Sequence, residues 1–166
     1  TQFETGITNL KIKRFDLCDL IKQLVDSYEI KMKQKDVEIT YEFGNDKSIF
    51  VNADNLRITQ VMSNLIENSL KYGVENGTIE IVTKNLSKEK VLVRVIDNGQ
   101  GISEEDLPRV FERFYRVDKT RNRQEGGSGL GLAIVKHIVE AHNEIVYVES
   151  SLNVGSEFSF TLTKSY

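Results

Sequence analysis

The sequence has few of the residues that build disulfide frameworks or transition-metal sites. Its 166 residues include one cysteine, Cys18, and two histidines, His137 and His142. One cysteine excludes an internal disulfide and a cysteine-based zinc site, and two histidines leave few ligands for a transition metal. The cysteine count favours a reducing compartment. Cys18 has helical spacing with Ile21 and Val25, which indicates a packing residue and not a reactive thiol.

The sequence also lacks a long apolar run and a large excess of one charge. No stretch approaches the roughly 20 apolar residues that span a bilayer, and no charged-then-apolar leader begins the chain. We therefore expect a soluble chain that makes no direct membrane contact. The 22 Lys and Arg and the 25 Asp and Glu give a net charge of −3. Because nucleic-acid binding needs excess positive charge, we expect no nucleic-acid partner.

The composition that remains, with 39% hydrophobic and 28% charged residues, is that of one globular domain. Apolar residues at helical spacing, with Asp16 and Asp54 as N-caps, predict helices over 17–28, 54–72 and 129–142. Short apolar or alternating segments predict strands at 37–43, 49–51, 78–84, 90–97, 145–149 and 156–163. Adjacent strands do not alternate strictly with helices. We therefore predict an α/β fold, a two-layer sandwich whose mixed β-sheet is covered on one face by about three helices.

The second predicted helix carries a line of polar residues on one face. Asn64, Asn68 and Lys71 are spaced i, i+4 and i+7, and Glu67 lies beside them. An amide oxygen suits Mg²⁺, and a lysine one turn later can reach a phosphate. Taken alone, the pattern is more typical of a solvated helix face than of a binding site.

A carboxylate and two glycines directly follow a predicted strand in the segment DNGQGI, residues 97–102. Asp97, at the end of the strand, is placed to accept a hydrogen bond from the exocyclic amine of adenine. Gly99 and Gly101 allow the backbone to approach a flat ring closely or to adopt a positive φ. By itself the segment is more often a tight turn between elements.

Glycines also precede the third predicted helix, in the segment GGSGLGL, residues 126–132. Exposed N–H groups at a helix N-terminus bind phosphate with help from the helix dipole. The segment is neither a P-loop nor a GxGxxG motif, and a flexible linker is the alternative. A linker, however, would not pass directly into an apolar helix. Together the three segments offer a metal ligand, an adenine acceptor and a phosphate cradle, which are the parts of an ATP site.

Four boxes in this order resemble the catalytic, ATP-binding domain of bacterial sensor histidine kinases. Residues 64–72, NLIENSLKY, resemble the N box, and residues 97–102 resemble the G1 box. Residues 111–118, FERFYRVD, resemble the F box, and residues 126–142 resemble the G2 box with its helix. The match extends over about residues 15–163, including GSEFSF in the closing strand. The resemblance implies the Bergerat fold, which these kinases share with DNA gyrase, a class of heat-shock chaperones and MutL.

The resemblance also implies ATP and Mg²⁺ as cofactors and assigns roles to individual residues. Asn68 would bind Mg²⁺, Asp97 would accept from adenine, and residues 118–128 would form an ATP lid. The implied catalytic residues are Asn64, Glu67, Lys71 and Arg116. The implied nucleotide-binding residues are Asn68, Lys71, Tyr72, Asp97, Gly99, Gly101, Ile102, Gly127, Ser128, Gly129, Leu130 and Gly131.

The family's phosphoacceptor, a histidine followed by an acidic residue on an upstream dimerisation hairpin, has no counterpart in this sequence. His137 precedes Ile138 and His142 precedes Asn143, so we interpret both histidines as structural or surface residues. We expect residues 15–166 to be the catalytic domain of a larger kinase and residues 1–14 to be a linker or the tail of that hairpin. The expected partners are ATP, the dimerisation domain and a cognate response regulator. The expected location is the cytoplasmic side of a membrane-bound kinase.

The resemblance thus predicts a domain that binds Mg-ATP and transfers the γ-phosphoryl group to a histidine of the dimerisation domain. An ATPase of the gyrase or chaperone type is one alternative. Such ATPases carry a glutamate general base four residues before the metal-binding asparagine, whereas this chain has Asn64 there. A non-catalytic nucleotide sensor is another alternative, because it would keep the same ATP-binding residues. The F box favours histidine kinases over related serine kinases that act on anti-anti-sigma partners.

Overall fold

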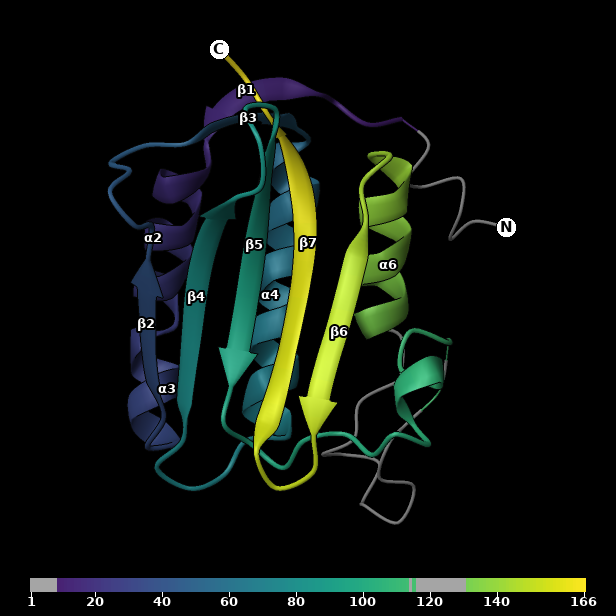
Figure 1. Ribbon diagram of the computed structural model, residues 1–166. Helices are drawn as coiled ribbons and strands as arrows, with labels where there is room; N and C mark the ends of the chain where they lie inside the picture. Colours follow the sequence, from purple (N-terminus) through teal and green to yellow (C-terminus); the bar gives the residue numbers. More distant parts are fainter. Residues whose placement is uncertain (1–8, 114, 116–130) are drawn as a thin grey trace.

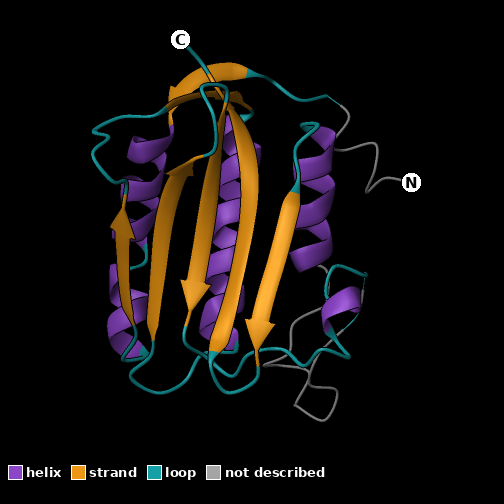
Figure 2. Cartoon of the chain, in the orientation of Figure 1, coloured by secondary structure: helices purple, strands orange, loops and turns teal. Residues whose placement is uncertain are grey.

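The structure, a computed structural model, describes residues 9–113, 115 and 131–166. In these residues seven strands form one mixed sheet, and helices pack against one of its faces (Figure 1). The other face of the sheet is left without a helix in the described part of the chain (Figure 2). The predicted two-layer α/β sandwich is confirmed.

The order of strands in the sheet differs from their order in the chain. The strands are β1 (Lys13–Asp16), β2 (Glu38–Glu42), β3 (Phe50–Ala53), β4 (Thr78–Asn85), β5 (Lys90–Asp97), β6 (Val146–Ser151) and β7 (Gly155–Lys164). They follow the order β1-β3-β7-β5-β4-β2, and β6 also pairs with β7. The β2–β4 pair is parallel, whereas β4–β5, β5–β7 and β6–β7 are antiparallel.

Two of the helices, α2 (Leu17–Ser27) and α4 (Asn55–Lys71), begin directly after the capping residues that the sequence predicts. The other described helices are α3 (Glu29–Gln34) and α6 (Gly131–Ala141), with a short 3-10 helix η1 (Leu107–Arg109). Asp16 accepts from the N–H of Cys18 and Asp54 from the N–H of Arg57, so both predicted N-caps are confirmed. Among the described residues, no helix combines the length and apolar character that a membrane crossing requires.

The core lies between the sheet and the helices. The apolar stripe of α4, from Ile58 to Leu70, is buried as predicted, and it joins one cluster with the inward side chains of β5 and β7. Cys18 is fully buried in the same cluster. Burial raises the pKa of the Cys18 thiol to about 11, so the thiol stays protonated near neutral pH. The packing role expected for Cys18 is confirmed.

Two short elements were not predicted from the sequence. The strand β1 includes Lys13 and Arg14, which the sequence pattern left in an N-terminal linker, and it pairs with β3. Its side chains are exposed or half-buried, so it lacks the apolar alternation that marks a strand. The helix α3 buries only Met32, which is too little for a recognisable stripe. β1 depends on pairing with a strand that is distant in sequence, whereas α3 packs mainly against its chain neighbours α2 and β2.

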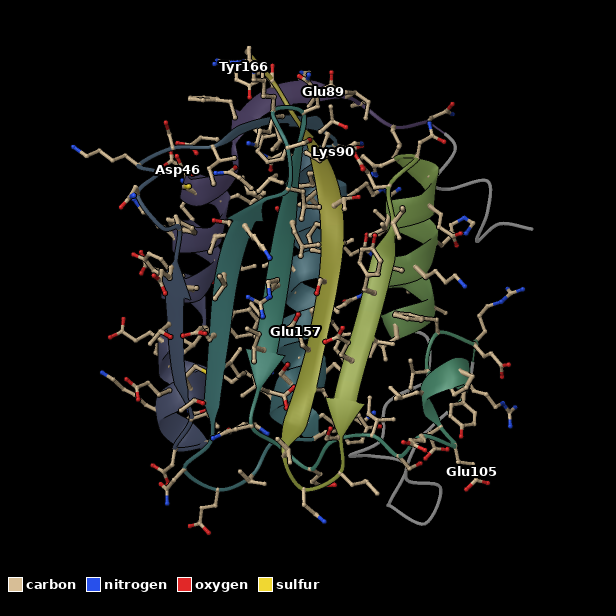
Figure 3. The ribbon with its side chains drawn as sticks, viewed as in Figure 1. Asp46, Glu89, Lys90, Glu105, Glu157 and Tyr166 are labelled. Atoms are coloured by element: carbon tan, nitrogen blue, oxygen red, sulfur yellow. The ribbon has the colours of Figure 1, made fainter. Side chains whose placement is uncertain are left out.

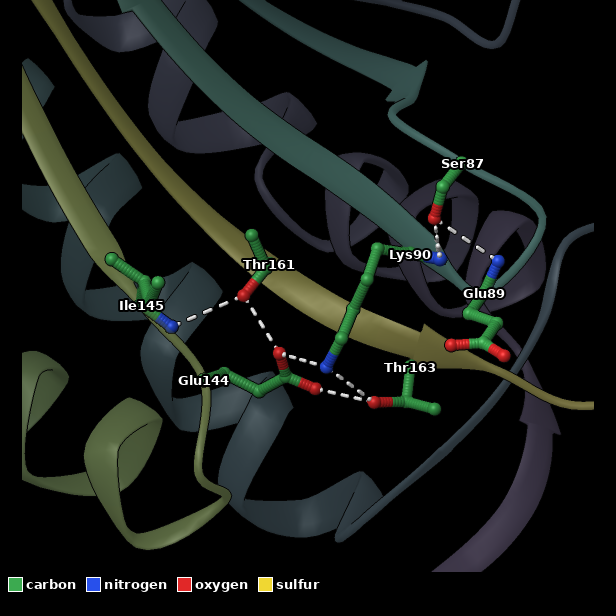
Figure 4. A network of polar contacts seen from close by, with 7 residues as sticks. All are labelled: Ser87, Glu89, Lys90, Glu144, Ile145, Thr161 and Thr163. Atoms are coloured by element: carbon green, nitrogen blue, oxygen red, sulfur yellow. Dashed lines mark hydrogen bonds and ion pairs between the residues drawn. The ribbon is translucent and has the colours of Figure 1, made fainter.

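The uncovered face of the sheet is polar and contains a network around Glu144, directly before β6. Figure 3 shows Lys90 and Glu157 on this face. The Glu144 carboxylate is buried and accepts hydrogen bonds from Lys90 Nζ, Thr161 Oγ1 and Thr163 Oγ1, each at 2.7 Å (Figure 4). Because Lys90 begins β5 and the two threonines lie on β7, one carboxylate connects three parts of the sheet.

We expect Glu144→Gln to lower the free energy of unfolding by about 1–3 kcal/mol at pH 7. Burial by itself raises the pKa of Glu144, but hydrogen bonds from Lys90, Thr163 and Thr161 outweigh burial and hold the pKa below its ordinary 4.5. The ionised carboxylate therefore stabilises the fold fully above the unfolded pKa, and this contribution disappears as the pH falls through the folded pKa.

Urea unfolding at pH 7 and at about pH 3 checks this expectation, because the difference between wild type and variant should shrink in acid. Glu42→Gln is a matched control, since Glu42 is an exposed glutamate of β2. A difference for Glu144→Gln that is the same at both pH values would contradict a role for the ionised carboxylate.

Candidate ATP-binding site

Asp97, the last residue of β5, has a carboxylate whose direction is fixed by three donors. Its Oδ1 accepts from the backbone N–H of Gly99 (2.9 Å) and of Ser156 (3.3 Å), and its Oδ2 accepts from Ser69 Oγ (3.1 Å). Burial raises the pKa of Asp97, and these hydrogen bonds oppose the rise in part. A carboxylate has about four lone-pair positions, so a further donor, such as an adenine amine, can still bind to Asp97.

The N box on α4 contacts the G1 box and the described part of the G2 box. Asn64 Nδ2 donates to the carbonyl oxygen of Gly131, at the start of α6 (3.2 Å). At the end of α4, the carbonyl oxygen of Tyr72 accepts from the N–H of Gln100 in the G1 box (3.0 Å). The Lys71 ammonium lies 5.0 Å from the centre of the Tyr72 ring. The fold therefore brings together three segments that are separated by up to 67 residues in sequence.

Asn68 lies one helical turn after Asn64, on the same face of α4, and is half-buried. The described residues contain no group of three or more His, Cys, Asp or Glu side chains that could hold a metal. A single amide oxygen suits Mg²⁺, which keeps several waters and takes its other ligands from substrate phosphates. Asn68 therefore fits the metal role that the sequence predicts, with the nucleotide supplying further ligands.

Glu67 lies at a different angle around α4 and contacts the neighbouring helix. Both of its carboxylate oxygens accept from Lys31 Nζ of α3, each at 2.8 Å. Burial, together with the charge of Glu67 and a hydrogen bond to it, raises the pKa of Tyr28 to about 12. The structure thus places Glu67 beside Tyr28 and Lys31, and its predicted part in phosphoryl transfer stays a prediction.

The glycines of the G1 box are required by the protein's own backbone. A Cβ atom on Gly99 would lie 2.5 Å from the carbonyl oxygen of Tyr72, and one on Gly101 would lie 2.1 Å from that of Ser151. Gly101 also has the positive φ, +75°, that the sequence analysis offered as one reason for a glycine. The structure shows a close approach of these glycines to neighbouring chain segments, and their approach to a flat ring stays a prediction. Ile102, which follows, is buried.

Several predicted site residues lie outside the described part of the chain. They are Arg116, Gly127, Ser128, Gly129 and Leu130, together with the expected lid over residues 118–128. Gly131 is described, and it is exposed at the first position of α6.

Sequence reasoning missed three serines that hold Asp97 and the loops beside it. Ser69 is 2% exposed, and its position among the apolar residues of α4 was the available signal. Ser150 Oγ accepts from the N–H of Ile102 (2.7 Å) and lies 2.8 Å from Ser156 Oγ. These contacts join β6, β7 and the G1 box, and no local pattern marks them.

Comparison with known proteins gives the same assignment as the four boxes. Residues 53–165 match the family model described as histidine kinase-, DNA gyrase B-, and HSP90-like ATPase. The sensor histidine kinase WalK of Bacillus subtilis is 40% identical over 84% of this chain, which spans 23% of that relative's length. The sensor protein kinase WalK of Staphylococcus aureus is 37% identical over 96% of the chain, which spans 37% of that relative.

Solved structures of histidine kinases share this fold. The nucleotide-free catalytic domain of the histidine kinase ThkA superposes with a TM-score of 0.80 and 30% identity, covering 93% of this chain and 97% of that one. Full-length ShkA in complex with AMPPNP gives a TM-score of 0.82 at 26% identity, covering 95% of this chain and 32% of that one. The chain belongs to the family of histidine kinase-, DNA gyrase B- and HSP90-like ATPases, and it resembles the catalytic domains of the sensor histidine kinases in that family.

Proposed function

We propose that this chain binds Mg-ATP and transfers the γ-phosphoryl group to a histidine on a separate dimerisation domain of the same sensor kinase. The observation that carries the proposal is Asp97, whose buried carboxylate is aimed by three donors and keeps acceptor capacity. The helix α4, whose Ser69 binds Asp97, also carries Asn64, which contacts Gly131 at the start of α6. The box order and the similarity to WalK support the same function.

In the proposed site, Asp97 binds the adenine amine, Asn68 holds Mg²⁺ with the phosphates, and Lys71 adds positive charge. Phosphoryl transfer needs mainly positioning and charge stabilisation from a protein. Asn64 argues against a gyrase-type ATPase, because an amide cannot act as general base and this one donates to Gly131. We further propose a cytoplasmic location within a membrane-bound kinase and a response regulator as a later partner. A solved complex of ThkA with the response regulator TrrA supports the second point.

Phosphoryl transfer between separated domains tests the proposal. The chain is mixed with γ-labelled ATP, Mg²⁺ and the dimerisation domain of its own kinase, and the labelled protein is treated with acid and with alkali. Acid-labile, alkali-stable label on the dimerisation domain is expected, with none on this chain. Label on His137 or His142, or rapid ATP hydrolysis by this chain alone, would contradict the proposal.

We expect Asn68→Ala to weaken binding of Mg-ATP by at least ~10-fold and to affect metal-free ATP far less. The reason is that the variant removes the amide oxygen proposed to hold the metal. Calorimetric titrations with excess Mg²⁺ and with EDTA measure the two affinities. Asn55→Ala, at the exposed first position of the same helix, is the control. Equal losses with and without metal would show that Asn68 does not bind Mg²⁺.

A further inference from the structure

A polar junction of Lys11, Asp54 and His142 connects the N-terminal segment to both helices of the candidate site. The backbone N–H of Lys11 donates to Asp54 Oδ2 (2.9 Å), while Asp54 Oδ1 caps α4 by accepting from the N–H of Arg57 (3.2 Å). The backbone N–H of Asp54 donates to Nε2 of His142, directly after α6 (3.1 Å). Asp54 is 8% exposed, so these contacts are largely shielded from water.

The two ring nitrogens of His142 have different roles in this junction. Its Nε2 must carry a lone pair to accept from Asp54, and its Nδ1 lies 2.8 Å from the carbonyl oxygen of Ile138, where it must donate. Both contacts are made by the tautomer that carries its hydrogen on Nδ1. Residue 142 consequently supplies an acceptor to α4 and a donor to α6 through the same ring.

The two helices run antiparallel and are held by polar contacts at two levels. Asp54 and His142 meet where α4 begins and α6 has ended, whereas Asn64 meets Gly131 where α6 begins. Between these levels the buried residues of both helices belong to the apolar core. Apolar contact is non-directional, so the hydrogen bonds at the two levels define how far one helix is shifted along the other.

We infer that the junction of Lys11, Asp54 and His142 positions α4 relative to α6 and couples that position to the N-terminal segment. Asn64 and Asn68 lie on α4, so a shift of α4 against α6 moves them relative to Gly131 at the start of α6. A displacement of the backbone at Lys11 would therefore move Asp54 and the start of α4, and with them Asn64 and Asn68. The inference rests on the proposed function for the meaning of that movement, whereas the positioning itself is measurable without nucleotide.

A matched pair of variants at residue 142 tests the positioning. His142→Asn keeps a donor near the Nδ1 position but has no acceptor that reaches Asp54, whereas His142→Gln extends an amide oxygen to about the Nε2 position. In the nucleotide-free protein, His142→Asn should shift the NMR signals of the Asn64 and Asn68 side-chain amides, and His142→Gln should restore them. The affinity for ATP should fall about 3- to 10-fold in His142→Asn alone.

A second pair tests the connection to the N-terminal segment. Lys11→Pro removes the backbone N–H that donates to Asp54, whereas Lys11→Ala keeps it and removes only an exposed side chain. Lys11→Pro should shift the same Asn64 and Asn68 signals, and Lys11→Ala should not. Since both routes pass through Asp54, the effects of Lys11→Pro and His142→Asn should be non-additive in the double variant.

Unmoved Asn64 and Asn68 signals in folded His142→Asn and Lys11→Pro would overturn the inference. Additive effects in the double variant would overturn the coupling to the N-terminal segment. If one of these two variants does not fold, the Asn64 and Asn68 signals of the other variant still test the inference. Failure of the proposed function would differ from these outcomes, because the wild-type chain would then show no affinity for ATP.

Discussion

Asp97→Asn should reduce the affinity for ATP by roughly ten- to a hundredfold without unfolding the protein. The expected loss is one charge-assisted hydrogen bond to the adenine amine, about 1.5–3 kcal/mol. An asparagine can keep the internal contacts of Asp97. Its oxygen can accept from the N–H groups of Gly99 and Ser156, and its amide can donate to Ser69 Oγ, which turns to accept. The ligand then faces a donor in place of an acceptor.

The same reasoning predicts a change in base preference. Inosine triphosphate carries a 6-oxo acceptor where ATP carries an amine, so the wild-type carboxylate should disfavour it strongly. In Asp97→Asn the amide donor matches the 6-oxo group, and the ratio of ATP affinity to inosine triphosphate affinity should fall toward one or below. Calorimetry with both nucleotides measures this ratio. A large preference for ATP that survives in the variant would show that Asp97 does not read the base.

Stability distinguishes a binding defect from a folding defect. Burial raises the pKa of Asp97 above its ordinary 3.8, so ionisation of Asp97 costs more in the folded state than in the unfolded state. The ionised Asp97 carboxylate therefore begins to destabilise the fold as the pH rises past the unfolded pKa. This destabilisation reaches its full size above the folded pKa. At pH 7 Asp97→Asn should melt at the wild-type temperature or higher. Asp46→Asn is the control, because Asp46 is bonded to Asn85 at the other end of the sheet (Figure 3).

Much of the fold could be predicted because its main elements carry local signals. α4 combines a capping residue with a continuous apolar stripe, and β4 and β5 are apolar strands joined by a polar hairpin. Neither β1 nor α3 has such a pattern, because β1 is exposed or half-buried and pairs with the remote strand β3, and α3 buries only Met32. Local periodicity reports burial against the core, and it does not report an exposed strand that completes a sheet.

The candidate site shows the same division. The types and spacing of Asn64, Asn68 and Asp97 pointed to nucleotide chemistry from the sequence alone. The contacts of Asp97 with Ser69 and Ser156, and of Glu67 with Lys31, span 28 to 59 residues, and one sequence does not display them. The purpose of the glycines was predictable only in part. A positive φ can be expected from a glycine in a turn, but the segment that it touches is known only from the fold.

Gly101→Ala should cost about 2–5 kcal/mol of folding free energy and should disrupt the G1 box. The added Cβ meets two penalties. The backbone φ of +75° is unfavourable for an L-residue with a side chain, by about 1–2 kcal/mol. The Cβ would also lie 2.1 Å from the carbonyl oxygen of Ser151, so the chain itself must move, at a further ~1–3 kcal/mol.

Gly44→Ala separates these two penalties. Gly44 has a similar φ of +63°, and nothing lies within 4 Å of the position its Cβ would take. It should therefore lose only the conformational part, about 1–2 kcal/mol. Urea unfolding of both variants measures the difference between their free energies of unfolding. ATP titration at a temperature where both variants are folded measures whether the nucleotide site is intact. In Gly101→Ala the end of β6 at Ser151 must move, and the neighbouring Ser150 accepts a hydrogen bond from the N–H of Ile102 in the G1 box. ATP binding should therefore weaken in Gly101→Ala and stay unchanged in Gly44→Ala. Equal destabilisation in the two variants would mean that the β6–β7 turn moves aside freely and does not hold the G1 box.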